Sequence, residues 1–145
     1  MHDYPQLNAQ DVIALVRNGD TVAFSGFSPA GGAKAVPRIL AAHAEAEHSR
    51  GRDYSLRVMT GASAGDFIDN DLAKAKAIRW RAPYQGGKIL RDQINRQEVQ
   101  YVDMHLSHLA QTVSAGFFGH VDTAVVEATE ITRDGRVYLS TSIGC

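Results

Sequence analysis

The sequence predicts an α/β fold: an open, mostly parallel sheet with helices on both faces and an antiparallel hairpin near the C-terminus. Stretches typical of strands alternate with stretches typical of helices along the whole chain. Successive strands before the last pair are separated by roughly 15 or more residues, the length that a crossover between parallel strands requires. The dipeptide Asp134-Gly135 then gives a strong signal for a tight turn between two antiparallel strands.

The N-terminal half is expected to hold two helices and two strands. The first helix begins after Asn8, whose side chain can cap it, and ends at Gly19, since glycine tolerates the left-handed conformation of a helix end. A buried strand follows over residues 21–25, and a second helix over residues 36–49. Residues 54–60 alternate between apolar and polar side chains, which is typical of a strand.

The C-terminal half repeats this alternation. Helices are expected over residues 66–76, 88–97 and 105–115. Strands are expected over residues 77–81, 99–103, 123–128 and 137–141. The last two of these strands form the hairpin around Asp134-Gly135, which we expect to add an antiparallel edge to the sheet.

A glycine-rich stretch from Ser25 to Pro37 lies between the first predicted strand and the second helix. Ligands bind at this end of a strand in open α/β sheets. The stretch is not a P-loop, because Gly32 and Ala33 stand where lysine and serine or threonine are required, and it lacks the dinucleotide pattern Gly-x-Gly-x-x-Gly. It is therefore either a plain turn or a ligand-binding loop. Residues 61–65 and 83–87 form two further small-residue loops at strand ends.

Other chemistry-bearing residues give weaker signals. Asp103, His105 and His108 could share a helix face, but no second carboxylate or cysteine has metal-site spacing, so we do not expect a metal site. Ser25 and Ser28 lack the Gly-x-Ser-x-Gly pattern of a hydrolase nucleophile.

Several charged side chains lie near the predicted loops. We expect them to be solvated surface charges, although any of them near a loop mouth could attract an anion; they are Lys34, Arg79, Arg81 and Lys88. Glu127 follows an apolar run, so it is either a residue at a strand end, the alternative we favour, or a buried carboxylate with a raised pKa.

Composition excludes several classes of protein. The 145 residues suit one domain, and a net charge of −1, from 15 basic and 16 acidic residues, offers no field for nucleic acid. The single cysteine, Cys145, excludes an internal disulfide and a multi-cysteine zinc site. No apolar run approaches the roughly 20 residues that span a membrane, and the N-terminus lacks the regions of a signal peptide. We therefore expect a cytoplasmic protein.

Six segments, in this order, resemble the acetyl-CoA hydrolase/transferase family, which belongs to the class I CoA-transferases. They are NGDTVAFSGFSPAG at 18–31, KAVP at 34–37, RAPYQ at 81–85, LRDQIN at 90–95, YVDMHLS at 101–107 and STSIG at 140–144. Each segment alone is weak, whereas the ordered set is specific and spans nearly the whole chain. Two positions depart from the family pattern: Gly32-Ala33, which suggests a more flexible loop, and Cys145, where asparagine is expected.

The resemblance implies two similar domains, of which residues 1–145 are the N-terminal part, and transfer of CoA between small carboxylic acids such as acetate and succinate. An active-site glutamate would attack the acyl-CoA thioester, and an enzyme–CoA thioester would form through an acyl-glutamyl anhydride. That glutamate lies in the missing second domain, so no catalytic residue is assigned here. Acyl-CoA is expected as substrate, with no tightly bound cofactor. The expected substrate-binding residues are Gly26, Ser28, Pro29, Ala30, Gly31, Gly32 and Gln85.

A different class of function remains open. The chain could be a stand-alone, non-catalytic domain that binds an anionic metabolite through the same glycine-rich loop. A domain that lacks its partner domain should expose an apolar face and tend to self-associate as a homo-oligomer. The extent of exposed apolar surface therefore discriminates between these two hypotheses.

Overall fold

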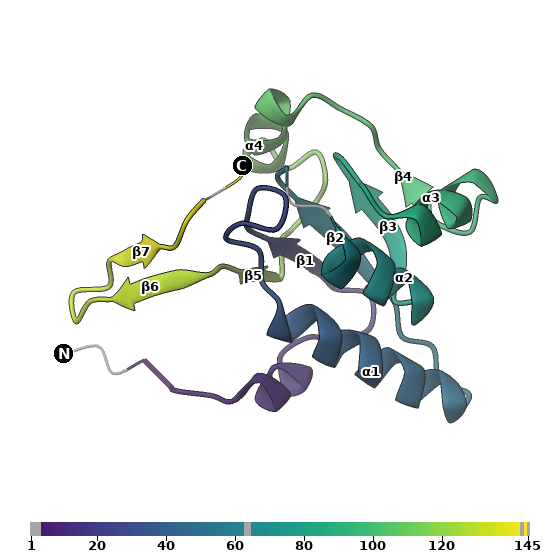
Figure 1. Ribbon diagram of the computed structural model, residues 1–145, viewed down its shortest axis with the longest axis horizontal. Coiled ribbons are helices and arrows are strands. Elements are labelled where there is room, and N and C mark those ends of the chain that lie inside the picture. The colour runs from purple at the N-terminus through teal and green to yellow at the C-terminus, as the bar shows by residue number, and fades with distance from the viewer. Residues whose placement is uncertain (1–3, 63–64, 143, 145) are drawn as a thin grey trace.

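A five-stranded parallel sheet forms the centre of the computed structural model, which describes residues 4–62, 65–142 and 144 (Figure 1). Its strand order is β4-β3-β2-β1-β5. The strands are β1 (Thr21–Phe24), β2 (Leu56–Thr60), β3 (Ile78–Ala82), β4 (Gln100–Tyr101) and β5 (Thr123–Val125). All four pairings between neighbours are parallel, as the connection lengths predict. The carboxyl ends of β1, β2 and β3 therefore lie side by side.

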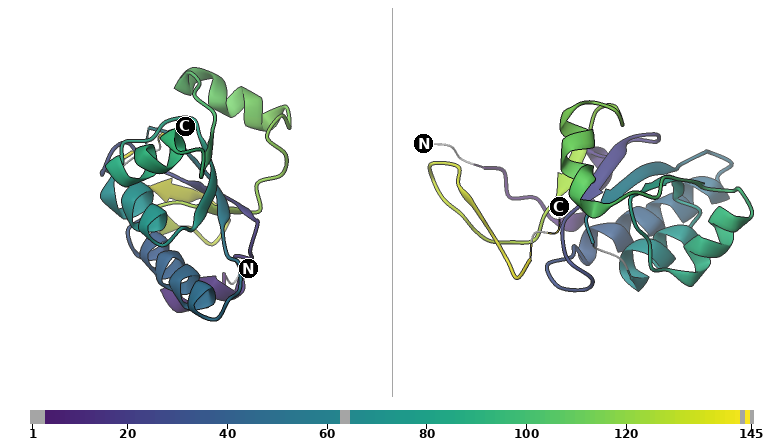
Figure 2. Two further views of the ribbon diagram at one scale, coloured as in Figure 1. Left: turned by 90° about the vertical axis from the view of Figure 1, so that its right-hand side faces the viewer. Right: turned by 90° about the horizontal axis from the view of Figure 1, so that it is seen from above.

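Helices cover the two faces of this sheet unequally. One face carries α1 (Ala35–Ser49), the π-helical turn η2 (Asp66–Asn70), α2 (Asp71–Lys74) and α3 (Lys88–Asn95), whereas α4 (Leu106–Ser114) lies on the other (Figure 2). A short 3-10 helix, η1 (Ala9–Ala14), packs beside α1 and is capped by the side chain of Asn8. The predicted fold class is confirmed.

The apolar core follows the same division. Its larger part lies between the sheet and α1, α2 and α3, and its fully buried members include Val22, Leu56, Val58, Leu40, Leu72 and Leu90. A smaller cluster of Met59, Trp80 and Ala82 lies on the face that α4 covers, with Val113 and Phe118 packed against it. Burial on both faces explains why Val22, Ala23 and Phe24 of β1 form a continuous apolar run, whereas Arg57 of β2 and Arg79 of β3 interrupt theirs.

Four predicted elements differ from those in the structure. The first helix is a six-residue 3-10 turn, and the helix predicted over 66–76 divides into η2 and α2. The predicted strand 99–103 is reduced to the two residues of β4. The predicted strand 123–128 breaks after Val125, and its end becomes the start of β6 (Ala128–Ile131).

The hairpin of β6 and β7 (Val137–Leu139) is antiparallel, as the Asp-Gly signal predicts, but it is a separate two-stranded sheet rather than an edge of the main sheet. Figure 1 shows it projecting away from the five strands. The chain turns out of the sheet at Glu127, whose backbone N–H donates to the Ser25 hydroxyl (3.3 Å) and whose side chain is held by Lys34 and Ser140. Large apolar residues are exposed in and beside the hairpin. They are Val126, just before β6, and Ile131, Val137 and Tyr138 within the hairpin.

Within residues 4–62, 65–142 and 144, no helix combines the length and the apolarity needed to cross a bilayer. Ser63 and Ala64 of the second predicted loop, Ile143 of the last family segment and Cys145 lie outside the described residues.

Candidate functional site

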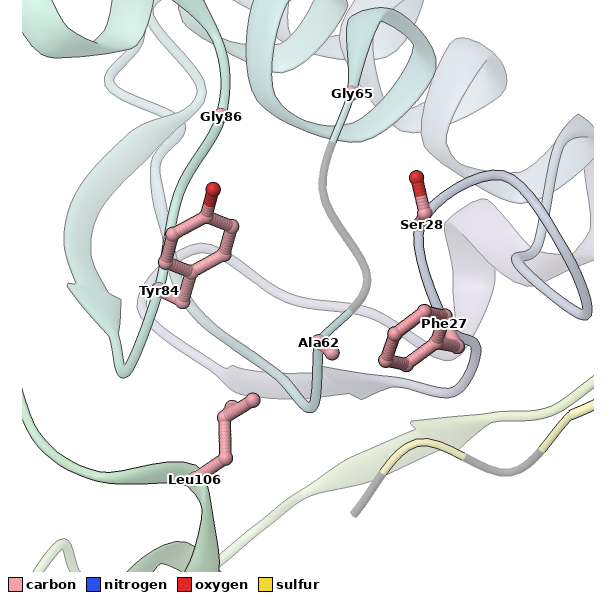
Figure 3. Close-up of a pocket in the computed structure, with 7 residues that line it drawn as sticks. All are labelled: Phe27, Ser28, Ala62, Gly65, Tyr84, Gly86 and Leu106. Atoms are coloured by element: carbon pink, nitrogen blue, oxygen red, sulfur yellow. The ribbon is translucent and has the colours of Figure 1, made fainter.

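A pocket of about 550 Å³ opens at the carboxyl ends of β1, β2 and β3. The loops after these three strands and the start of α4 provide its lining, which comprises Phe27, Ser28, Ala62, Gly65, Tyr84, Gly86 and Leu106. Figure 3 shows the rings of Phe27 and Tyr84 on opposite sides of Ala62, with Leu106 across the opening. The pocket therefore lies at the edge of the sheet where the glycine-rich stretch predicts a ligand.

The first wall of the pocket is the glycine-rich loop after β1. Phe27 and Ala30 exchange two backbone hydrogen bonds of 2.8 and 3.0 Å, which close a tight turn around Ser28 and Pro29. The Ser28 N–H donates to the Ala62 carbonyl (2.9 Å), so this turn is joined to the loop after β2. Phe27 is 60% exposed at the pocket mouth.

Glycine is required at the base of this loop. Gly26 has φ +122°, and a Cβ atom placed there would lie 2.7 Å from the backbone nitrogen of Gly32. Real Cβ atoms do not approach backbone this closely, and L side chains rarely adopt such a φ. The close approach of Gly26 and Gly32 explains why the loop holds several glycines, which a plain turn does not need.

The outer side of the loop is held by the C-terminal segment. The Ser142 hydroxyl donates to the Ala30 carbonyl (2.7 Å), and the buried Ser25 hydroxyl donates to the Gly31 carbonyl (3.1 Å). A side chain at Gly31, which has φ +64°, would meet the Ser142 backbone. The face of the loop opposite the pocket is therefore already occupied by the chain itself.

The Glu127 side chain joins the end of the glycine-rich loop to the C-terminal segment. Its carboxylate accepts from the Ser140 hydroxyl (2.6 Å) and from Lys34 Nζ (3.0 Å), and Lys34 also donates to the Gly32 carbonyl (3.0 Å). The Ser140 hydrogen bond, followed by Lys34, lowers the pKa of Glu127. The alternative of a buried Glu127 with a raised pKa is therefore wrong, and Glu127 is an ionised residue just after the end of β5.

The second wall is built on an ion pair that no solvent reaches. Arg81 of β3 and Asp69 of η2 are both 0% exposed, and the Arg81 Nη2 and Nε atoms lie 3.1 and 3.2 Å from Asp69 Oδ1. Asp69 Oδ2 accepts from the backbone N–H of Gly86 (2.8 Å) and of Gly65 (3.3 Å). The prediction that Arg81 is a solvated surface charge is wrong, because its guanidinium is paired and fully buried.

Arg81 also contacts the end of β2 and its own strand. Its Nη2 donates to the Thr60 hydroxyl (2.9 Å) and its Nη1 to the Ala82 carbonyl (2.6 Å). Burial lowers the pKa of Arg81, and the neighbouring Asp69 carboxylate opposes that effect. A planar guanidinium suits this role because it can donate in several fixed directions at once.

The other predicted surface charges lie on the surface. Lys34 and Lys88 are exposed and paired with Glu127 and Asp92, and Arg79 donates to the Gly19 carbonyl (2.8 Å). The rings of His105 and His108 have centroids 5.9 Å apart. Among the residues that the structure describes, no three histidine, cysteine or acidic side chains lie close enough to hold a metal ion.

The predicted binding residues differ in whether they line the pocket. Ser28 lines it, whereas Gly26, Pro29, Ala30, Gly31 and Gly32 belong to the same loop behind the lining. Gln85 lies between two lining residues, Tyr84 and Gly86, and its Oε1 atom is buried without a hydrogen-bond partner. Sequence reasoning did not assign six of the described lining residues to substrate binding, namely Phe27, Ala62, Gly65, Tyr84, Gly86 and Leu106. An aromatic residue within or beside each small-residue loop was the available signal for Phe27 and Tyr84.

The chemistry of the pocket is that of an uncharged binding surface. Its described lining residues offer backbone groups, the hydroxyls of Ser28 and Tyr84, and the apolar surface of Phe27, Ala62 and Leu106. None of these described residues has a carboxylate that could act as a nucleophile.

Sequence similarity assigns the chain to a known family. It belongs to the family described as acetyl-CoA hydrolase/transferase N-terminal domain, which it matches over residues 1–145. It is 44% identical over 141 residues to the propanoyl-CoA:succinate CoA transferase of Escherichia coli K12. It is 41% identical over 135 residues to the succinyl-CoA:acetate CoA-transferase of Clostridium kluyveri, and 34% over 139 residues to the acetyl-CoA hydrolase of Schizosaccharomyces pombe.

The alignments cover 97%, 92% and 92% of this chain but only 29%, 24% and 26% of those relatives, so the chain spans less than a third of their length. Two solved structures share the fold. An acyl-CoA transferase of Escherichia coli O157:H7 aligns with a TM-score of 0.62 at 18% identity, over 77% of this chain and 22% of that one. The glutaconate coenzyme A-transferase of Acidaminococcus fermentans aligns with a TM-score of 0.59 at 19% identity, over 79% of this chain and 36% of that one.

Proposed function

We propose that this chain is the N-terminal domain of a protein that moves CoA between small carboxylic acids or hydrolyses acetyl-CoA, and that it supplies one side of the acyl-CoA cleft. Family membership supports the reaction class. The observation that carries the assignment of the site is the pocket at the carboxyl edge of the sheet, whose described lining is uncharged and largely apolar.

The uncharged lining favours one part of the substrate. The acetyl group and the amide-linked arm of acetyl-CoA are uncharged, whereas its phosphates carry the negative charge. The described lining residues have no cationic side chains, and this suits the uncharged end, because backbone amides and two hydroxyls can hydrogen-bond to its amides and thioester. The phosphates would then lie outside the pocket.

The reaction that we propose requires a glutamate that this chain does not supply. The glutamate carboxylate attacks the thioester carbonyl, the CoA thiolate leaves, and an acyl-glutamyl anhydride forms. The thiolate then attacks the glutamyl carbonyl, which gives a glutamyl-CoA thioester and releases the first carboxylate. An acceptor carboxylate or water resolves this thioester. Glu127 is not the nucleophile, because Lys34 and Ser140 hold its carboxylate and it does not line the pocket.

We propose further that a second domain supplies the glutamate and covers apolar surface that this domain exposes. The hairpin region exposes Val126, Ile131, Val137 and Tyr138, and exposed apolar groups so close together are typical of an interface. The same surface would allow self-association of the isolated chain. Analytical ultracentrifugation tests this: association should weaken when Ile131 and Tyr138 are replaced by serine.

Binding without turnover is the expected result for the purified chain. Calorimetry should detect acetyl-CoA binding, while a steady-state assay with acetyl-CoA and succinate detects no product. Leu106→Glu, which places a negative charge in the pocket, should abolish binding, and the matched surface variant Leu15→Glu should not. Turnover by the purified chain would contradict the assignment of the nucleophile, and equal binding by both variants would contradict the assignment of the pocket.

The second candidate is a stand-alone domain that binds a small anionic metabolite. Its support is the set of backbone groups around the glycine-rich loop, but the described lining offers no cationic side chain to such an anion. The same calorimetry discriminates between the two. Binding of succinate or acetate in the absence of CoA, at affinities similar to that of acetyl-CoA, would favour this second candidate.

A further inference from the structure

The buried pair of Asp69 and Arg81 is hydrogen-bonded to several segments around the pocket, although it does not itself line it. Asp69 lies in η2 and Arg81 in β3, twelve residues later, and both side chains are 0% exposed. Moving two charges out of water is unfavourable, and pairing alone seldom compensates for it. A fully buried pair of this kind therefore needs further hydrogen bonds, and their partners show what it holds.

These partners belong to the loops that form one wall of the pocket. Asp69 Oδ2 accepts from Gly65 and Gly86, which are themselves lining residues. Arg81 Nη2 donates to Thr60, two residues before the lining residue Ala62. Four of the seven described lining residues, Ala62, Gly65, Tyr84 and Gly86, thus lie within two residues of a group bonded to this pair.

Steric contact around Gly87 fixes the same wall. A Cβ atom at Gly87 would lie 2.7 Å from Asp69 Cβ and 2.6 Å from the side-chain oxygen of Asn70. That oxygen also accepts from the Ile89 N–H (3.0 Å). The loop of residues 83–87 is therefore pressed against η2, and its position depends on where Asp69 is held.

We propose that Asp69 and Arg81 are positioning residues, which set the spacing between the side of the pocket that contains Ala62 and Gly65 and the side that contains Tyr84 and Gly86, for its ligand. The pair acts through the backbone, because it orients Gly65 and Gly86 without touching the ligand. This proposal rests on the proposed function for the identity of the ligand, acyl-CoA, but the backbone positions that it predicts do not depend on that identity.

The test separates positioning from stability with a charge-balanced variant. Asp69→Val combined with Arg81→Met removes both charges and the acceptor for Gly86, and replacing both members of a buried pair by apolar residues is often tolerated. Arg81→Lys keeps the charge with fewer fixed donors. Lys88→Met combined with Asp92→Asn removes an exposed ion pair of 2.8 Å and is the matched control.

Two readouts are expected to change together in the purified chain. In the unsubstituted chain the Gly86 amide should exchange slowly with solvent, because it donates to a buried carboxylate. In the charge-balanced variant that protection is lost and acetyl-CoA binds about tenfold or more weakly, the scale that misplaced binding groups produce. Arg81→Lys should fall between the two, and the surface control should match the unsubstituted chain.

The outcomes that overturn the proposal are distinct from those that overturn the proposed function. If the charge-balanced variant folded and bound acetyl-CoA with unchanged affinity, the pair would only stabilise the fold and the proposal would be wrong. Fast exchange of Gly86 in the unsubstituted chain would contradict the proposal even if every variant failed to fold. Absence of acetyl-CoA binding by the unsubstituted chain would contradict the proposed function alone, since exchange at Gly65 and Gly86 would still decide whether the pair positions this wall.

Discussion

The two walls of the pocket are held by different means. The wall formed by the loops after β2 and β3 is fixed by side chains, since Asp69 and Arg81 bind groups from three separate segments. The wall formed by the loop after β1 is fixed by backbone: a turn closed between Phe27 and Ala30, and glycines that allow Gly26 to lie against Gly32. The Ser28 N–H donates to the Ala62 carbonyl and so joins the two walls.

This difference indicates how each wall responds to substitution. A network of buried charges fails as a unit, because removing one member leaves another buried and unpaired. A backbone turn fails locally, because strain at one residue affects mainly its neighbours. The wall built on Asp69 and Arg81 is therefore expected to be rigid, and the glycine-rich wall to tolerate changes outside its glycines.

The largest expected effect comes from breaking the buried pair on one side only. Arg81→Met leaves the Asp69 carboxylate buried without its partner, so the free energy of unfolding should fall by about 3–5 kcal/mol. Urea unfolding followed by Trp80 fluorescence measures this change. The charge-balanced variant Asp69→Val with Arg81→Met should recover most of the loss, and equal losses in the two variants would contradict this account of the wall built on the buried pair.

A smaller effect is expected in the glycine-rich wall after β1. Gly26→Ala combines a φ of +122° with a close contact to Gly32, so it should lower the free energy of unfolding by about 2–3 kcal/mol. The control is Gly51→Ala, at φ +71° with nothing within 4 Å of the added Cβ, which should lower it by about 1 kcal/mol. If the two substitutions were equally destabilising, the close approach of Gly26 and Gly32 would not matter for stability.

The contacts of the Glu127 carboxylate with Lys34 and Ser140 predict that the stability of the folded chain depends on pH. The pKa of Glu127 is lowered in the folded chain, so its stabilisation is complete above the ordinary pKa of a glutamate and is lost as the pH falls through the lowered folded value. Thermal unfolding between pH 7 and pH 3 should therefore show a steeper loss in the unsubstituted chain than in Glu127→Gln. Glu45→Gln, at an exposed position of α1, is the control and should keep the steeper loss. If stability fell equally with pH in Glu127→Gln and in the unsubstituted chain, the contacts of the Glu127 carboxylate would not contribute to stability.

The smallest effect is expected at the exposed pair of Lys88 and Asp92, four residues apart on α3. Lys88→Met should change the free energy of unfolding by about 0.5 kcal/mol or less, because solvent and salt screen such pairs. The change should shrink further in 1 M NaCl. An effect as large as that of Arg81→Met would mean that burial does not distinguish the two ion pairs.

Much of the architecture could be predicted because it follows from local pattern. The apolar strands, their long connections and the Asp-Gly turn give a parallel sheet and a hairpin, and the structure contains both. The order of the strands and the separation of the hairpin from the sheet depend on contacts between distant residues, such as Glu127 with Ser25 and Lys34. No periodicity within the sequence encodes those contacts.

The site was predicted less completely, for a physical reason. Glycines mark the loop after β1, because close backbone approach requires them, and Ser28 of that loop lines the pocket. No comparable signal in the sequence marks Arg81, because charged residues are seldom fully buried without a partner. Its partner Asp69 lies in a different element, η2. A wall held by backbone is therefore visible in the sequence, whereas a wall held by paired side chains becomes visible only in three dimensions.

The most direct test of the central claim is to map where acetyl-CoA binds to this chain. Titration of acetyl-CoA into the isotopically labelled chain should shift the amide resonances of Phe27, Ser28, Ala62, Gly65, Tyr84, Gly86 and Leu106 more than any others. Shifts concentrated instead in the groove that contains Ser55, Arg79 and Glu98, or no shifts at all, would contradict the assignment of the pocket as one side of an acyl-CoA cleft.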